Sequence, residues 1–141
     1  GYIGKSGNVQ LIIDLNSVDT MIPIRNERMQ ALLFETAAFP NATVTADVDA
    51  AVLAAVAEGG TVGTEIPVKL SLHGMEQTVT ASVTVFSDEG NLRVMSSRPV
   101  ILNAADFGLA GGVEALREIA GLNSISIAVP VTLNLQFRHA P

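Results

Sequence analysis

The last part of the chain, residues 123–138, alternates between apolar side chains and polar or small ones. The apolar side chains occupy every odd position of residues 125–137: Ile125, Ile127, Val129, Val131, Leu133, Leu135 and Phe137. A period of two is typical of a β-strand that buries one face. A single strand over residues 125–137 would be roughly 40 Å long, which exceeds the usual length of a strand. Because so long a strand has to coil, the pattern predicts a curved sheet of the kind found in barrels.

Shorter segments with alternating or apolar residues predict the remaining strands. They are residues 2–3, 9–15, 42–46, 67–72, 78–86 and 92–102. Turn-forming residues at 5–8 and 87–91 predict hairpins between the strands that flank them. Pro130 cannot donate to a sheet, so a bulge or a local edge is expected there. The predicted fold class is all-β, an extended antiparallel β-barrel.

Three segments between the predicted strands favour short helices. Residues 25–34 are rich in helix formers and place their apolar side chains on one side. An Ala-rich segment follows Asp47 and Asp49, either of which can cap its first turn. These carboxylates lie two residues apart, and capping is a commoner use for them than acid–base chemistry. Residues 113–120 form the third predicted helix, which Gly121 ends.

The composition limits the class of protein. The chain has 141 residues, which favours one domain. Hydrophobic residues make up 48% of it and aromatic residues only 4%, so strands and smooth aliphatic surfaces are favoured. The net charge of −6 argues against nucleic acid and anionic membranes as partners. No apolar run is long enough to span a bilayer, and stable membrane insertion is not expected.

Residues that could carry chemistry are few. The chain has no Cys and no close His or Glu–His cluster, so neither a metal nor another cofactor is expected. No Gly-x-Ser-x-Gly motif occurs, and no catalytic residue is predicted. His73, at a strand end, is expected to make a structural hydrogen bond, although a hydrolase or isomerase using His73 with a carboxylate is a weaker hypothesis. Arg25 and Arg28 lie on one helical face and can bind a polar head group or pair with carboxylates.

Five short sequence blocks occur in the order found in a known family. They are Ser-Val-Asp-Thr (17–20), Arg-Asn-Glu-Arg-Met (25–29), Phe-Pro-Asn-Ala (39–42), Leu-Ser-Leu-His-Gly (70–74) and Asp-Phe-Gly-Leu (106–109). On the basis of these five blocks, the chain resembles the YceI-like family. The resemblance implies a lipocalin-like barrel around a long apolar pocket, and binding of polyisoprenoids or related amphiphilic lipids. It also implies a periplasmic or secreted location, usually in bacteria.

The chain departs from the family pattern in three places. Relatives carry one or two strands before the position of Gly1, so the single domain of residues 1–141 is expected to be incomplete at its N-terminus. Asn26 stands where Asp is common in the family. Ala104-Ala105 stands where an Arg often precedes the Asp-Phe-Gly block, which leaves the head-group preference open. Missing strands would expose sheet edges, and a two-fold dimer through those edges is one expected outcome.

The resulting prediction is a non-enzymatic protein that binds, transports or sequesters a long apolar lipid. The ligand is expected to be a polyisoprenoid, a quinone-like lipid or a fatty-acyl amphiphile. The alternative is a structural module that forms a homodimer and binds no ligand. Alternation alone does not decide which strand face points inward. The predicted head-group residues are Arg25, Arg28 and His73. The predicted lumen residues are Leu11, Ile13, Met29, Leu33, Phe34, Leu70, Val83, Ile127, Val129, Val131 and Leu133.

Overall fold

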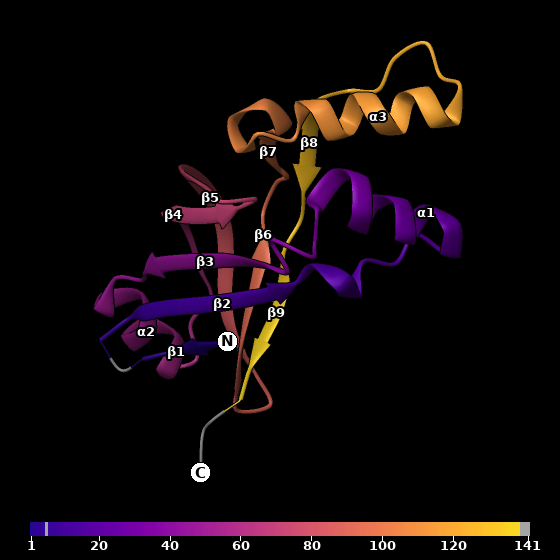
Figure 1. Ribbon diagram of the computed structural model, residues 1–141. Helices are drawn as coiled ribbons and strands as arrows, with labels where there is room; N and C mark the ends of the chain where they lie inside the picture. The colour runs from indigo at the N-terminus through magenta and orange to yellow at the C-terminus, as the bar shows by residue number, and fades with distance from the viewer. Residues whose placement is uncertain (5, 139–141) are drawn as a thin grey trace.

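The computed structural model describes residues 1–4 and 6–138 and shows a strongly coiled antiparallel sheet (Figure 1). Its seven strands follow the order β1-β2-β3-β4-β5-β6-β9, and β7 and β8 form a separate pair. The strands are β1 (Tyr2–Ile3), β2 (Asn8–Asp14), β3 (Asn41–Asp47), β4 (Val62–Leu72), β5 (Met75–Asp88), β6 (Asn91–Ser96), β7 (Val100–Asn103), β8 (Ala128–Val131) and β9 (Asn134–Phe137). The sheet is nearly closed, and the predicted all-β, lipocalin-like barrel with a few short helices is confirmed.

Two tight hairpins flank β5, the longest strand. His73 and Gly74 connect β4 to β5 with φ angles of 55° and 73°. Glu89 and Gly90 connect β5 to β6 with φ angles of 52° and 83°. Two consecutive left-handed residues are typical of the type I′ turn, whose twist matches that of the flanking strands. The hairpin at residues 87–91 is therefore confirmed.

The prediction of one long strand over residues 123–138 is wrong. Residues 123–127 are not in a strand, and the remainder divides into β8 and β9, which pair with β7 and β6 respectively. The change of partner occurs at Ser96: its backbone N–H donates to the Leu133 carbonyl (2.9 Å), while its hydroxyl oxygen accepts from the Leu133 N–H (2.9 Å). The Ser96 hydroxyl thus accepts the hydrogen bond that a backbone carbonyl would accept in a regular strand pair. The prediction of one strand over residues 92–102 is also wrong, because this segment divides into β6 and β7 around Pro99. The long alternating segment therefore has no continuous strand to pair with.

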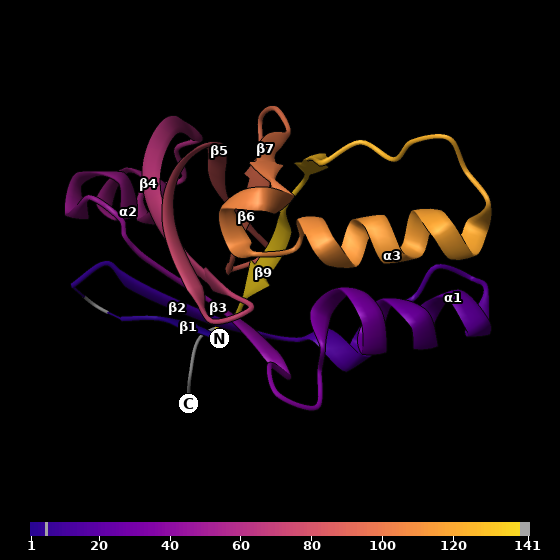
Figure 2. The same cartoon turned by 45° about the horizontal axis from the view of Figure 1, so that its top comes forward.

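The helices lie near the predicted segments. They are α1 (Pro23–Arg28), the π-helix η2 (Met29–Phe34), α2 (Ala50–Ala57), α3 (Ala110–Ala120) and the short 3₁₀ turns η1 (Leu15–Ser17) and η3 (Ala104–Phe107). The Asp49 carboxylate caps α2 by accepting from the Ala51 N–H at 2.9 Å. Gly121 ends α3 in a left-handed conformation, with φ of 67°. Figure 2 shows α3 running alongside α1 and η2 beyond the open side of the barrel.

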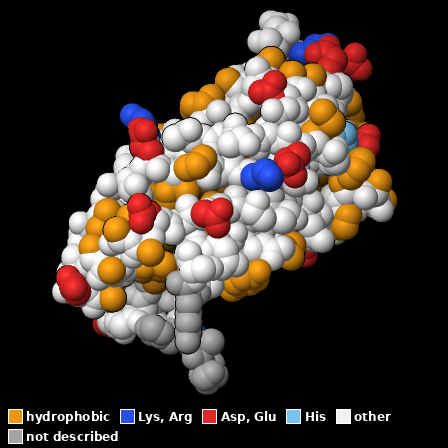
Figure 3. All heavy atoms as spheres, turned by 90° about the vertical axis from the view of Figure 1, so that its left-hand side faces the viewer, with side chains coloured by type: hydrophobic (Ala, Val, Ile, Leu, Met, Phe, Trp, Pro, Cys, Tyr) orange, Lys and Arg blue, Asp and Glu red, His pale blue; other side chains and the backbone are white. Residues whose placement is uncertain are grey.

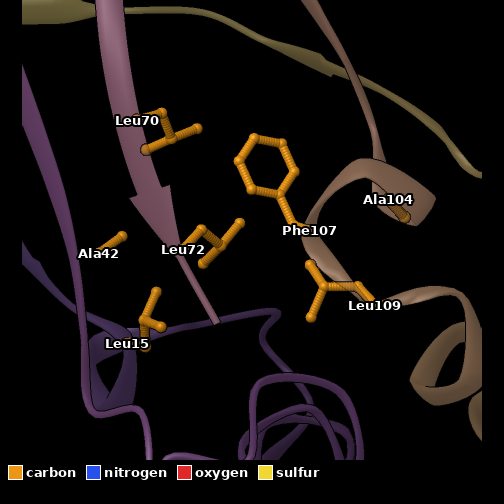
Figure 4. Packing of buried hydrophobic residues seen from close by; sticks show 7 residues of the cluster. All are labelled: Leu15, Ala42, Leu70, Leu72, Ala104, Phe107 and Leu109. Atoms are coloured by element: carbon orange, nitrogen blue, oxygen red, sulfur yellow. The ribbon is translucent and has the colours of Figure 1, made fainter. Parts of the chain in front are cut away.

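The buried side chains form two groups. At one end of the barrel, Val56 of α2 packs against Ile66, Val83 and Val85, so this end is filled by side chains. The second group joins β3 and β4 to η1, η3 and the residue before α3 (Figure 4): Leu15, Ala42, Leu70, Leu72, Ala104, Phe107 and Leu109. The part of the barrel next to this second group is not filled.

Candidate functional site

A cavity of about 500 Å³ occupies the unfilled part of the barrel. Strands, helices and the segment before β8 all contribute to its wall. The lining residues are Ile13, Leu15, Met29, Leu33, Phe34, Ala42, Val44, Val68, Leu70, Leu72, Val79, Ala81, Val100, Leu102, Ala104, Phe107, Leu109, Val113, Leu116, Ile125, Ser126, Val129, Val131 and Leu133. Ser126 is the only one of these described residues with a polar side chain. The volume is within the range of about 300–1,000 Å³ that is usual for small-molecule sites.

The strand wall follows from alternation and register. Ile13 lies opposite Ala42, Val44 opposite Leu70, and Val68 opposite Val79. Because paired residues of adjacent strands point to the same face, these side chains form one continuous apolar surface. Small side chains in this wall, such as those of Ala42 and Ala81, leave space that larger residues would fill.

The π-helix η2 supplies a second wall. Its Met29, Leu33 and Phe34 line the cavity. In a π-helix the hydrogen bonds join residues i and i+5, so Met29 and Phe34 fall on the same side. Gly112 of α3 packs tightly against η2: a methyl group at this position would lie 2.7 Å from the Leu32 carbonyl oxygen. This close approach holds the two helices together over one side of the cavity.

Phe107 closes another part of the cavity. Its ring extends from η3 toward Leu70 and Leu72 (Figure 4), and its side chain is among the most deeply buried described. Gly108, with φ of 67°, turns the chain directly after it. The ring therefore forms the boundary of the cavity at this end.

The exposed lining residues mark the opening. Ile13, Ile125, Ser126 and Val129 are exposed to solvent, whereas the other lining residues are buried or half-buried. Ile13 belongs to β2, Ile125 and Ser126 belong to the segment that leads into β8, and Val129 belongs to β8. The cavity therefore opens between β2 and residues 125–129.

Most of the predicted lumen residues meet at this cavity. Its wall includes Ile13, Met29, Leu33, Phe34, Leu70, Val129, Val131 and Leu133. Leu11, Val83 and Ile127 do not line it. Val83 belongs to the barrel end that α2 fills, and Ile127 is exposed because its segment leaves the sheet. Binding of a ligand by the wall residues stays a prediction.

Sequence reasoning missed the contributions of η3, α3 and β7. These are Ala104, Phe107, Leu109, Val113, Leu116, Val100 and Leu102. The Asp-Phe-Gly-Leu block at residues 106–109 was a signal for two of them, because Phe107 and Leu109 are its apolar members. Residues 113–120 also had a visible apolar face. Neither pattern predicts that the connection between β7 and β8 folds over the barrel.

The predicted head-group residues lie outside the cavity wall. Arg25 and Arg28 are exposed on α1, and the Arg25 guanidinium donates to the Thr20 carbonyl at 2.7 Å. His73 is half-buried, and its ring packs at 4.6 Å from that of Phe39. Its Nδ1 lies 3.1 Å from the Phe107 carbonyl oxygen and its Nε2 lies 3.2 Å from a Glu35 carboxylate oxygen. Both ring nitrogens therefore face acceptor groups of the protein itself, and a head-group role for His73 stays a prediction.

Charged groups elsewhere follow ordinary surface chemistry. On α3 the side-chain hydrogen bond from Arg117 lowers the pKa of Glu114 below its usual range. No group of three or more potential metal-ligating His, Cys, Asp or Glu side chains occurs in the described part of the chain. The predicted lack of a metal stays a prediction.

None of the helices in the described ranges has both the length and the apolar character needed to cross a membrane.

Comparison with known proteins gives consistent matches. The model of the YceI-like domain matches residues 3–137. A polyisoprenoid binding domain from Saccharophagus degradans, implicated in plant cell wall breakdown, is 40% identical and superposes with a TM-score of 0.92, covering 98% of this chain and 80% of that one. BcnA of Burkholderia cenocepacia is 21% identical, with a TM-score of 0.67 and coverages of 90% and 72%. The YCEI protein of Campylobacter jejuni is 11% identical, with a TM-score of 0.66 and coverages of 99% and 79%. The last two show likeness of fold alone.

Proposed function

Because this chain belongs to the YceI-like family, we propose that its cavity binds the apolar chain of a polyisoprenoid or a related amphiphilic lipid. The observation that carries the proposal is the cavity of about 500 Å³, lined by aliphatic side chains and Phe34 and Phe107. The polyisoprenoid binding domain that is 40% identical supports the ligand class.

The driving force is the transfer of hydrocarbon from water into this cavity. Burial contributes about 0.8 kcal/mol for each CH₂ group, before the cost of association is subtracted. A polar ligand would lose its hydrogen bonds to water, and Ser126 is the only side chain of the described wall that offers a replacement. The wall therefore favours ligands whose inserted part is entirely apolar.

The polar end of the ligand is proposed to stay at the opening. Ser126 is exposed there, beside Ile125 and Val129. Arg25, Arg28 and His73 lie off the wall, so they are weaker candidates for head-group contacts than the opening itself. Binding needs no reacting group, and we infer a carrier or sequestering protein rather than an enzyme. We also propose a periplasmic or secreted location, because the family resemblance implies it.

Extraction of the purified protein with organic solvent, followed by mass spectrometry, tests for a bound lipid. Uptake of a fluorescent prenyl probe tests the site. Val131→Phe fills part of the cavity without adding charge, and we expect roughly tenfold weaker binding. Ile127→Phe is the matched control, since Ile127 lies on the same segment but off the wall. Unchanged affinity in a folded Val131→Phe protein, together with a lipid-free extract, would contradict the proposal.

A homodimer through sheet edges is a second candidate function. On the β1 side of β2, only Val9 and Gln10 are paired, and β9 is the last strand at the other edge of the described sheet. Unpaired strand edges favour addition of another strand. Sedimentation velocity across a range of protein concentrations tests this. A monomer at all concentrations would argue against it.

A further inference from the structure

The outer ends of α1 and α3 carry a group of exposed, large apolar side chains. The beginning of α1 and the end of α3 lie on the same side of the molecule, away from the strands (Figures 1 and 2). The exposed side chains there are Met21, Ile22, Ile24, Ile119 and Leu122, which we call the helix-tip patch. None of the five lines the cavity. Such a group on a soluble surface usually marks a contact with another molecule.

Met21 is the most exposed of these residues, with 88% of its surface accessible. Its φ angle is 64°, a left-handed conformation that disfavours residues with a Cβ atom. The Asp19 carboxylate holds this turn by accepting from the Met21 N–H at 2.9 Å. The methionine side chain gains no burial within the chain in return for the strain. Its position is better explained by an apolar environment outside the molecule.

Two cations lie beside the helix-tip patch. Arg25 and Arg28 are three residues apart on α1, so they share a helical face, and both are exposed. Neither forms an ion pair with a described carboxylate, whereas Arg98 and Arg117 both do. Acidic side chains are scattered over the opposite side of the molecule (Figure 3), and Asp19, Glu27 and Glu118 are exposed next to the patch itself. Apolar side chains next to arginines that form no ion pair are the combination that fits lipid tails below phosphate groups.

We propose that the helix-tip patch docks onto the surface of a phospholipid bilayer, with Arg25 and Arg28 beside lipid phosphates. Leu122 in the patch is three residues before Ile125 at the cavity opening, a distance of at most about 10 Å along the chain. Docking therefore brings the opening close to the bilayer. This extends the proposed function, because a lipid then has only a short distance to pass between bilayer and cavity. The net charge of −6 makes the attachment weak and reversible.

Flotation of the purified protein with vesicles of phosphatidylcholine, with and without phosphatidylglycerol, measures docking without any cavity ligand. We expect the wild-type protein to float with both kinds of vesicle. Met21→Ser with Ile24→Ser should weaken partitioning roughly tenfold or more. The matched control is Ile12→Ser with Ile101→Ser, two residues that are 59% and 62% exposed on strands. Arg28→Glu should weaken binding most on vesicles that contain phosphatidylglycerol.

The proposal would be overturned if the tip and control variants lost vesicle binding equally. It would also be overturned if the wild-type protein stayed in solution at every lipid concentration. It would also be overturned if the tip variant only converted a dimer into a monomer, since the patch would then contact a second copy. The prenyl-probe assay in detergent-free solution is expected to be unchanged in the tip variant. Failure to dock and failure to bind a lipid are thus distinguished.

Discussion

The imidazole of His73 connects the β4–β5 turn to the residue that closes the cavity, since its Nδ1 lies 3.1 Å from the Phe107 carbonyl oxygen. The second nitrogen lies 3.2 Å from the Glu35 carboxylate, just after η2. The carbonyl and the carboxylate are both hydrogen-bond acceptors, and both lie within reach of the imidazole ring. One side chain therefore joins the turn, η3 and the end of η2 around the cavity.

His73→Asn tests this connection. Asn tolerates the left-handed conformation of position 73, where φ is 55°, so the turn is kept while both side-chain contacts are lost. We expect the free energy of unfolding, measured with urea, to fall by about 1–3 kcal/mol. Glu35→Gln keeps an acceptor oxygen and removes only the charge from the exposed contact, so it should cost less. Equal stability of His73→Asn and wild type would show that the contacts contribute nothing.

Phe107 is expected to limit the length of the bound chain. Phe107→Ala enlarges the cavity and should cost about 3–5 kcal/mol of stability, while Phe107→Leu should cost less. In a series of prenyl alcohols of increasing length, the Phe107→Leu protein should bind longer members than the wild type does. An unchanged preference for chain length in both folded variants would place the ligand's end elsewhere.

Adjacent glycines of α3 provide a matched pair. A methyl group at Gly112 would lie 2.7 Å from the Leu32 carbonyl oxygen and 2.9 Å from the Leu33 Cα, whereas at Gly111 it would meet nothing within 4 Å. Gly112→Ala should therefore destabilise the protein by about 1–3 kcal/mol. Gly111→Ala should stabilise it by about 0.4–1 kcal/mol, because alanine favours helices. Thermal unfolding measures both, and equal shifts would argue against tight packing of α3 on η2.

The Glu114 carboxyl is expected to titrate below its usual range, because the side-chain hydrogen bond from Arg117 lowers its pKa. An NMR titration of the side-chain carboxyl carbons measures this pKa, and Arg117→Met should return it to the ordinary value. The depressed pKa stabilises the fold above the unfolded-state pKa, and the stabilisation is lost as the pH falls through the folded-state value. Glu114 is exposed and Arg117 is only half-buried, so solvent screens the pair and the effect on stability should be small.

Local features of the fold were predictable from sequence because their causes are local. Alternation predicted the strands of the β2–β5 region, since a strand turns successive side chains to opposite faces. Asp49 and Gly121 predicted the boundaries of their helices, since a cap acts through the nearest backbone groups. The apolar alternation of residues 125–137 also indicated lumen residues such as Val131.

Other features depended on which segments meet. Alternation alone did not predict which face of each strand points into the barrel. The closure of the sheet determines this face. Val83 continues the pattern of Ala81, yet α2 packs over it and fills that end of the barrel. The long alternating segment divides at Leu133 because Ser96, far away in sequence, takes over its hydrogen bonds. The sequence by itself determined the strands of the β2–β5 region and the helix caps, through contacts between near neighbours. The tertiary structure decided the cavity and its opening, because these depend on the packing of α2, α3 and η3 against the sheet.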